Sequence, residues 1–583
     1  MTHHPPLYVC PVVLGLVAIA SLSLASAVPV GHWSRYRVEM APDNKLAVTE
    51  VEMAVLGTAR VGRTDCVWWQ LTAYEGEQER YTIKLLAEDL DFLRAEPGPL
   101  RAARYQFAPA GGVALEYVDL NTKRALLPPC EFVRILLPHA VKGSRSLPLF
   151  TRGSYLGHPI RRIAAGIGAR DRIRRVRKLM LDPMLTIGTG RNSRDEYAKR
   201  MYQPGEPFPE GRPDYPLVLF TAEDYDLMIE EVGMNQFRVS ADQLQYVQDR
   251  PVFFVGAVDM SRLPELLYRS NYLGVRQFMD EPAIITIGQA KYRDCRTPAE
   301  AAERFVAHVR EERQQGKYSV NVMQEGIEKA GCSFGDLKFV QDNYPVWETV
   351  EASAWFQFEA GMPGFVNEGR FQPEPFARDI RDSLGVDFPA TDEAIIKFHY
   401  AWWRGAARHF NAKWGIAIYG QMDLDTAKKV FPAAYDRGAA YLWFWTCDHE
   451  HHTPFTEQIA HTRRLRAYQR AHRRPPVEKL IHAAPLAIAL PYGYLMDGWA
   501  FRHREMWNDA DHLSLDMDNG RGATYGDVLK AAMQEVVDAL RRGEDFDLIY
   551  WREGEQYPGY REIRRVGEDA KVTILPGSPG GGK

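Results

Sequence analysis

The sequence predicts an α/β protein in which a central (β/α)8 (TIM) barrel lies between an N-terminal β-sandwich domain and a small C-terminal α/β domain. Short β-rich runs separated by Gly, Pro, Asn and Asp fill residues 33–147. Alternating strand and helix patterns fill residues 214–470, and a further strand-helix-strand pattern follows Pro475 and Pro476. Such alternation is typical of parallel βα units, and eight of them without a Gly-rich phosphate turn favour a barrel over an open nucleotide-binding sheet.

The barrel strands are expected where short apolar runs precede polar residues. They are residues 217–220, 234–239, 252–257, 275–279, 347–350, 364–366, 415–419 and 441–445. Between them, Thr297, Pro298 and Glu300 predict a helix start, because they supply an N-cap, a Pro in the first turn and a capping carboxylate. Thr221 and Asp224 form a weaker version of the same pattern.

The remaining segments follow from changes in composition. Residues 151–213 contain many Arg, and we expect a solvated helix or connector there, with contact to an acidic substrate as the alternative. The C-terminal domain is expected to contain strand 486–490, helix 525–542, strand 546–551 and a β pair ending near residue 575. The predicted boundaries are a signal peptide at 1–27, the β-sandwich at 28–150, the connector at 151–213, the barrel at 214–470, the small α/β domain at 471–575 and a disordered tail at 576–583.

The N-terminus resembles a secretory signal. Residues 11–24 are mostly apolar, and residues 25–27 read Ala-Ser-Ala, a small-x-small cleavage site. We expect cleavage after Ala27 and a secreted or periplasmic protein. The apolar run is shorter than the ~20 residues of a membrane-spanning helix. However, His3 and His4 replace the usual Lys or Arg, so a membrane or lipid anchor stays open.

The overall charge indicates no charged partner. A formal net charge of −4 is small for 583 residues, so no general field attracts nucleic acid or an anionic membrane. We therefore expect no nucleic-acid partner and no stable membrane insertion after signal cleavage. The sequence does not predict an oligomeric state.

Acidic residues directly after predicted strands are the best catalytic candidates, because active sites of such barrels lie at the carboxyl ends of the strands. The fourth strand runs into Asp280 and Glu281, and the sixth runs into Asn367, Glu368 and Arg370. Cleavage of a glycosidic bond needs one carboxyl group to protonate the leaving oxygen and a second to attack or to activate water. Glu281 and Glu368 are the predicted pair.

Other residues at strand ends supply alternatives and contacts to a sugar. Glu348 and Glu351, after the fifth strand, are alternative second carboxylates. Glu359 lies in a predicted helix and is expected to be structural. The predicted substrate-binding residues are Asp280, Asn235, Arg238, Asn367, Arg370, Tyr419, Gln421, Trp443, Trp445, Asp448 and His449.

The end of the eighth strand is rich in aromatic residues and His. Trp443 or Trp445 could stack on a sugar ring, with buried barrel aromatics as the alternative. Three His and two acids within residues 448–452 could ligate zinc, but metal ligands usually converge from separated positions. We therefore expect a polar rim that binds sugar hydroxyls, and no metal or other cofactor.

The motif at the fourth strand resembles a known family pattern. Asp280-Glu281-Pro282 is similar to the Asn-Glu-Pro signature of the large retaining glycosidase superfamily, clan A, whose Glu at this position is the acid/base. The resemblance covers residues 214–470, and a barrel followed by a small α/β module is also similar to the family 42 β-galactosidases. Two departures are that Asp280 replaces the Asn that binds the sugar 2-hydroxyl and that the seventh strand lacks a nucleophilic Glu.

These departures bear on the second carboxylate and on the function. Because the predicted seventh strand lacks this Glu, the second carboxylate is expected from the fifth or sixth strand. The α-galactosidase-like clan uses the fourth and sixth strands, although with Asp. The predicted function is a secreted glycoside hydrolase that acts on a poly- or oligosaccharide. The alternatives are a polysaccharide lyase, a metal-dependent hydrolase, or a glycan-binding barrel without catalysis.

Overall fold

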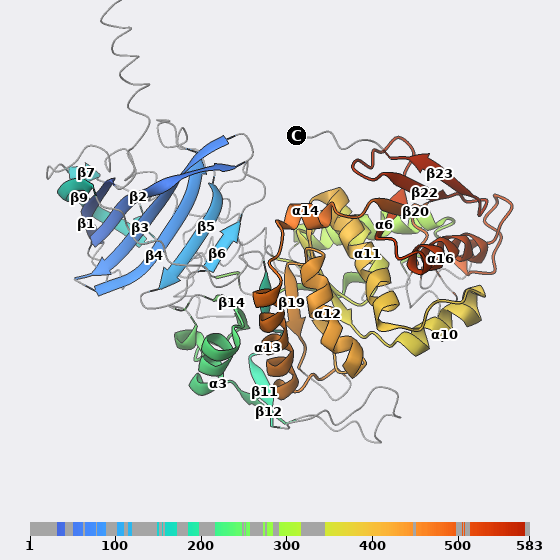
Figure 1. The fold of residues 1–583 in the computed structure, drawn as a ribbon, viewed down its shortest axis with the longest axis horizontal. Helices are drawn as coiled ribbons and strands as arrows, with labels where there is room; N and C mark the ends of the chain where they lie inside the picture. Colours follow the sequence, from blue (N-terminus) through green and yellow to red (C-terminus); the bar gives the residue numbers. More distant parts are fainter. Residues whose placement is uncertain are drawn as a thin grey trace, which may run out of the picture.

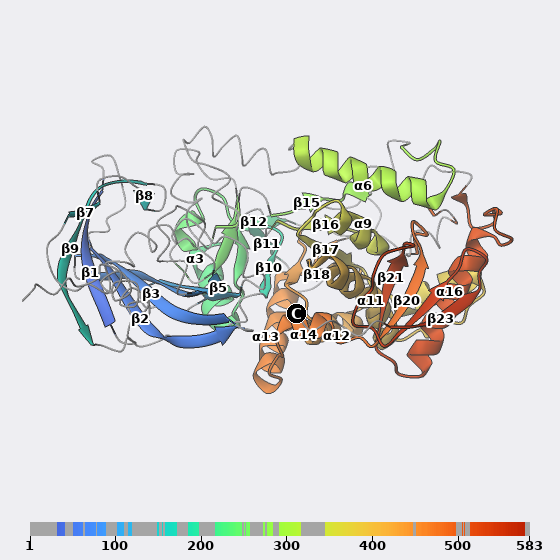
Figure 2. The same cartoon turned by 90° about the horizontal axis from the view of Figure 1, so that it is seen from above.

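The computed structural model describes the strands between His32 and Asp171 and most of the chain from 185 to 577 (Figure 1). The larger gaps after residue 185 are 197–215, 257–271, 284–290, 316–343, 447–450, 497–503 and 508–512. The predicted signal peptide at 1–27 and residues 578–583 of the predicted tail lie outside the described residues. Figures 1 and 2 show an N-terminal sheet and a C-terminal module at opposite ends, with a parallel sheet and its helices between them.

The N-terminal region is a single antiparallel sheet of nine strands in the order β6-β5-β4-β3-β2-β1-β9-β7, with β8 paired to β9. The strands are β1 (His32–Met40), β2 (Glu50–Val61), β3 (Thr64–Glu75), β4 (Gln78–Glu88), β5 (Ala102–Pro109), β6 (Leu115–Val118), β7 (Pro148–Phe150), β8 (Ser154–Tyr155) and β9 (His158–Asp171). The predicted sandwich of two sheets is therefore wrong for the described residues. Strand patterns indicate a face to be buried, but they do not determine whether the strands divide into two layers.

The Arg-rich segment is a strand where the structure describes it. Arg161, Arg162 and Arg170 lie in β9, which pairs antiparallel with β1 along most of its length. The prediction of a helix or connector is wrong for this stretch. The charge of the Arg residues suggested exposure, but exposure is also compatible with a strand that has one solvated face.

The central sheet contains eight parallel strands in the order β14-β13-β10-β19-β18-β17-β16-β15. They are β10 (Thr186–Thr189), β13 (Gln236–Arg238), β14 (Phe253–Val255), β15 (Met279–Asp280), β16 (Val346–Glu348), β17 (Gly364–Gly369), β18 (Lys413–Ile418) and β19 (Tyr441–Phe444). β10, the first of these strands along the chain, pairs with β19, the last along the chain, so the sheet curls. Leu273 donates to the carbonyl of Phe254 in β14, Gly274 accepts from the N–H of Gly256 just after β14, and Met279 pairs with Val346 of β16.

Seven of the eight predicted strands overlap this sheet, and the first does not. Residues Leu217–Leu219 form β12, which pairs antiparallel with β11 (Ser193–Asp195) outside the parallel sheet. The first parallel strand is β10, in the predicted connector. It is short and contains Gly188, where a Cβ atom would lie 2.0 Å from the carbonyl oxygen of Gln236. This close approach requires glycine, although glycine weakens a strand pattern in the sequence.

Helices cover the sheet at the positions that the alternation predicts. They are α3 (Ala222–Asp226), α6 (Pro298–Gln315), α9 (Ala354–Glu359), α10 (Pro373–Leu384), α11 (Asp392–Phe410), α12 (Leu424–Asp436), α13 (Phe455–Ala471) and α14 (Val477–Ile481), with a π-helical turn Leu227–Val232 and 3-10 turns Leu244–Tyr246 and Glu351–Ser353. Thr221 and Asp224 form the predicted capping box, and the Thr297 hydroxyl accepts from the Glu300 N–H. None of the described helices is both long and apolar enough to cross a membrane.

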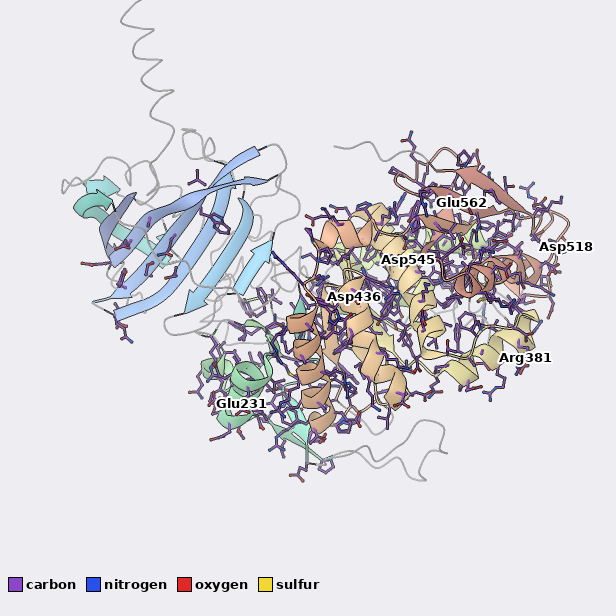
Figure 3. All side chains as sticks on the ribbon, viewed as in Figure 1. Glu231, Arg381, Asp436, Asp518, Asp545 and Glu562 are labelled. Atoms are coloured by element: carbon purple, nitrogen blue, oxygen red, sulfur yellow. The ribbon has the colours of Figure 1, made fainter. Side chains whose placement is uncertain are left out.

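The C-terminal module contains the predicted elements. They are β20 (Leu486–Pro491), α16 (Tyr525–Arg541), β21 (Phe546–Trp551), β22 (Glu562–Val566) and β23 (Val572–Pro576), in a sheet of order β21-β20-β22-β23. The module docks on α11 through Arg404, which bonds Asp547 at 2.6 Å and both carboxylate oxygens of Asp545 at 3.0 Å. Figure 3 shows Asp545 beside α11. As predicted, Glu359 lies in a helix, and it pairs with Arg552 of the module at 2.9 Å.

Aromatic residues fill the concave side of the curled sheet. Because side chains alternate along a strand, every second residue of neighbouring strands meets inside. The interior cluster consists of Trp347, Val366, Ala417, Tyr419, Ala440, Tyr441 and Trp443, with Phe278 and Trp445 packed against it. Leu442 and Phe444, between these positions in β19, belong to the core that faces the helices. The alternation also decides which carboxylates point inward.

Candidate active site

A cavity of about 410 Å³ lies at the carboxyl ends of the parallel strands. Glu281 reaches it from the end of β15, Glu351 from the turn after β16 and Glu368 from β17. Helices α10 and α11 supply further walls, with Phe376 and His399 among the lining side chains. The two carboxylates predicted as a pair therefore share one cavity on the face where barrel enzymes have their active sites.

Glu281 has an uncommon backbone conformation. Its φ of 36° is positive, a region that L residues with long side chains rarely adopt. The N–H of Glu281 donates to the carbonyl of Trp347 at 2.7 Å, which fixes the residue against β16. Backbone strain of this kind costs about 1–3 kcal/mol and persists where the surroundings hold the residue in place. This strained conformation lowers the stability of the fold and directs the Glu281 side chain into the cavity.

The surroundings of Glu281 favour its protonated form. Burial, followed by the negative charges of Glu368, Glu348 and Asp280, raises the pKa of Glu281 to about 9. A carboxyl group with this pKa carries its proton at neutral pH and can donate it. Glu281 is therefore suited to donate a proton, and the charge of Glu368 contributes to the shift of its pKa.

Glu368 is surrounded by hydrogen-bond donors. The indole N–H of Trp347 donates to Oε1 at 2.7 Å, and the guanidinium of Arg370 donates to Oε2. Only 5% of the Glu368 side chain is exposed. Both oxygens of Glu368 therefore accept hydrogen bonds from N–H groups. The two residues of the pair thus have different surroundings, since other acids lie near Glu281 whereas N–H donors bind Glu368.

Glu348, one alternative second carboxylate, points away from the cavity and is fully buried. Its Oε2 accepts from the N–H of Ala283 at 2.7 Å and from Gln357 at 3.1 Å. Its Oε1 accepts from the N–H groups of Thr349 and Val350. Burial raises the pKa of Glu348 to about 7, although these backbone donors act in the opposite direction. Glu348 connects Ala283, two residues after Glu281, to the backbone that follows β16. Its role is therefore structural support.

Glu351, the other alternative, lines the cavity beside a His that the sequence did not indicate. Nδ1 of His399 lies 3.5 Å from Oε1 of Glu351. The imidazole stacks on Phe371 with a centroid distance of 4.4 Å, and burial lowers the pKa of His399 to about 3. His399 comes from the middle of α11, where nothing in the local sequence distinguishes a cavity residue from a core residue.

Several predicted sugar-binding residues lie away from the cavity. Asn235 precedes β13 at the opposite end of the sheet, where its amide bonds the backbone of Ile187 and Leu185. Asn367 alternates with Glu368 and faces outward, where its amide donates to the carbonyls of Glu348 and Thr349. Asp280 and Arg238 are exposed at strand ends. Neither of them lines the cavity as it is described.

The predicted aromatic residues mostly form the interior cluster. Trp443 is 1% exposed, stacks on Trp347 and donates to Thr186 at 3.0 Å, which agrees with the alternative of a buried barrel aromatic. Tyr419 is buried behind Glu368, and its hydroxyl accepts from Trp347 at 2.7 Å. Trp445 is partly exposed, with the Arg191 guanidinium 4.7 Å above its ring.

The last predicted residues are at the ends of β18 and β19. Gln421 lies outside the cavity, but its carbonyl accepts from Gln372, which lines it. Asp448 and His449 lie outside the described residues. Within the part of the chain that the structure describes, no group of three or more His, Cys, Asp or Glu is arranged to hold a metal ion.

Comparison with known proteins adds no relative. No protein-family model matches the chain, and no curated protein matches its sequence.

Proposed function

We propose that this chain is a secreted glycoside hydrolase that cleaves a poly- or oligosaccharide with Glu281 and Glu368. The observation that carries the proposal is the shared cavity, in which one carboxyl group has its pKa raised to about 9 and the other accepts from Arg370 and Trp347. Pairs of titratable groups whose environments differ in this way supply the acid and base roles of glycosidases. We further propose that the curled sheet closes into a barrel between Leu273, which bonds to β14, and Met279, which pairs with β16.

The shared cavity is compatible with a retaining mechanism, in which the second carboxyl group attacks the anomeric carbon. Retaining enzymes place the groups ~5 Å apart, whereas inverting enzymes leave ~6.5–9.5 Å for a water molecule between substrate and base. Glu368 contributes to the raised pKa of Glu281, so the two carboxyl groups interact across the cavity, and we propose the retaining arrangement.

The reaction then proceeds in two steps. In the first, Glu281 transfers its proton to the glycosidic oxygen, the bond to the leaving group breaks, and an oxygen of Glu368 bonds to the anomeric carbon. In the second, the Glu281 carboxylate takes a proton from water, and the hydroxide attacks the anomeric carbon to release Glu368. Arg370 and Trp347 hold Glu368 in position throughout. Cavity walls formed by Phe371 and Phe376 limit access of bulk water.

A polysaccharide lyase is a weaker reading of this cavity. A lyase needs a positive group to neutralise the uronate carboxylate. Arg370 supplies the guanidinium among the described cavity residues, and it is bonded to Glu368. A glycan-binding protein without catalysis is also less favoured, since binding alone would not account for a strained backbone at a half-buried, protonated Glu281.

The proposal is tested by a screen of the purified mature chain against polysaccharides and aryl glycosides, with released reducing ends or aryl alcohol as the readout. We expect Glu281→Gln to lower kcat by about 10²–10⁴-fold, the usual contribution of general acid-base catalysis. Glu368→Gln should be at least as severe. Glu374→Gln, an exposed acid of α10 outside this cavity, is the matched control. Full activity in Glu281→Gln would contradict the mechanism.

A further inference from the structure

The charge of the cavity lining indicates which sugars it can hold. The lining contains four acidic side chains, Glu281, Glu351, Glu368 and Asp379, and one guanidinium, that of Arg370. Because Arg370 binds Glu368, and Glu281 carries a proton, the negative charges of Glu351 and Asp379 set the sign of the field. Like charges brought together in a partly desolvated site repel one another strongly.

Glu351 lines the same cavity as the pair and has His399 beside it. Its side chain is 17% exposed, and it begins the turn Glu351–Ser353 directly after β16. The backbone carbonyl of Glu351 accepts from the Trp403 indole at 3.2 Å. His399 is 2% exposed, its ring is fixed by stacking on Phe371, and its Nδ1, which makes no hydrogen bond, is directed at Glu351 from 3.5 Å.

We propose that Glu351, with the His399 ring beside it, is the specificity-determining residue of a sugar subsite in the cavity that contains Glu281 and Glu368. The subsite accepts sugars whose substituents donate hydrogen bonds, namely neutral hydroxyls or a protonated amine, and it excludes uronates and sulfated sugars. A hydroxyl or ammonium group donates to the Glu351 carboxylate, while an anionic substituent at the same place faces a carboxylate at short range. The inference rests on the proposed hydrolase function and names its substrate class.

The test compares sugars that differ only in charge. Aryl glycosides of a hexose, the matching 2-amino-2-deoxyhexose and the matching hexuronic acid are assayed in gluco, galacto and manno configurations and in both anomeric forms. In parallel, binding of the corresponding methyl glycosides to Glu281→Gln is measured by calorimetric titration. In the wild type we expect a preference of at least about tenfold for the neutral or amino sugar over the uronate.

Glu351→Gln should lower this preference about tenfold, because it removes the charge and keeps the shape of the side chain. Asp379→Asn, on the α10 wall, should lower it less and serves as the second variant if Glu351→Gln does not fold. Glu374→Gln removes a charge from the same helix outside the cavity and should leave the preference unchanged.

The outcomes separate this inference from the proposed function. A uronate preference in the wild type, or a preference that survives both Glu351→Gln and Asp379→Asn, overturns the inference while hydrolysis stands. Binding to Glu281→Gln that follows charge as expected, without hydrolysis by the wild type, overturns the hydrolase proposal and leaves the subsite. No binding of any of these sugars overturns both.

Discussion

The molecule buries charged side chains in two regions, and it treats them in opposite ways. At the contact between α11 and the C-terminal module, Arg404 and Arg408 face Asp545 and Asp547, so positive and negative charges balance. In the cavity, Glu281, Glu368 and Glu348 lie close together with Arg370 as the nearby guanidinium. The first arrangement stabilises the docked module, whereas the second leaves carboxyl groups in an unfavourable environment.

The pKa values express this difference. Although burial alone would raise the pKa of Asp545, the charge and hydrogen bonds of Arg404 hold it below its usual range. Burial and neighbouring acids raise the pKa of Glu281 to about 9. Charge clusters of both kinds occur in folded proteins, but a carboxyl group that stays protonated at neutral pH is a property that catalysis uses. The comparison teaches that the pairing of charge, rather than its burial, distinguishes a structural cluster from a reactive one.

The largest stability effect is expected at the balanced cluster. Arg404→Ala should lower the free energy of unfolding by about 3–5 kcal/mol, because it leaves the fully buried Asp547 without its closest cation. Denaturant unfolding measures this change. Arg378→Ala, at an exposed ion pair on α10, is the control and should change stability by less than about 0.5 kcal/mol. If Arg404→Ala lowers the free energy of unfolding by no more than Arg378→Ala does, the cluster does not stabilise the docked module.

A smaller effect is expected at Glu348, the support beneath the cavity. Glu348→Gln should lower stability by about 1–3 kcal/mol, because an amide NH₂ would face backbone N–H groups that now donate to a carboxylate. Hydrolysis should also fall, since the Ala283 contact positions Glu281. Denaturant unfolding and the pH profile of kcat are the measurements. Unchanged stability together with an unchanged pH profile would remove Glu348 from the support of the site.

The effect most specific to the comparison is in the pH dependence of stability. The folded pKa of Glu281 lies above its ordinary value of 4.5, so its destabilising effect is absent below pH 4.5 and increases toward pH 9. Glu281→Gln should flatten this decline by at most about 1.4 kcal/mol per pH unit. The lowered pKa of Asp545 acts in the opposite sense, because its stabilisation is lost as pH falls below its ordinary value of 3.8.

This last prediction is checked by urea unfolding between pH 3 and pH 9 for the wild type, Glu281→Gln and Asp545→Asn. Asp545→Asn should reduce the acid-side loss and leave the slope above pH 5 unchanged. If Glu281→Gln has the same slope as the wild type in that range, the carboxyl group is not protonated in the folded state, and its role as the acid fails.

The sequence predicted the site residues best where a recognisable strand ends in an acidic residue. The acids at 281 and 368 come at the ends of predicted strands, directly before Pro282 and Gly369, and both reach the cavity. The same alternation could have excluded two candidates. Trp347 and Val366 face inward, so Glu348 and Asn367, one position further along, must face outward. Glu348 and Asn367 were predicted to be site residues because they lie at strand ends, although their side chains are on the outer face of the sheet.

Other residues carried no such local signal. The first parallel strand, β10, was missed because Gly188 and its short length give a weak pattern, and its identity depends on pairing with β13 and β19. His399 enters the cavity only because α11 packs against the strand ends. Asn235 was assigned to a sugar site, although it lies at the opposite end of the sheet.

By itself, the sequence determined the class of the fold, most strands of the parallel sheet, the separate C-terminal elements and the two acids at the ends of the fourth and sixth strands. These features depend on short-range patterns, namely apolar periodicity, caps and strand-ending residues. Only the tertiary structure decided that the N-terminal strands form one sheet, that Trp443 is buried, and that Glu281 meets Glu368. These depend on contacts between residues far apart in the chain, and a carboxyl group acquires a pKa of about 9 only when such contacts exclude water and bring other acids near.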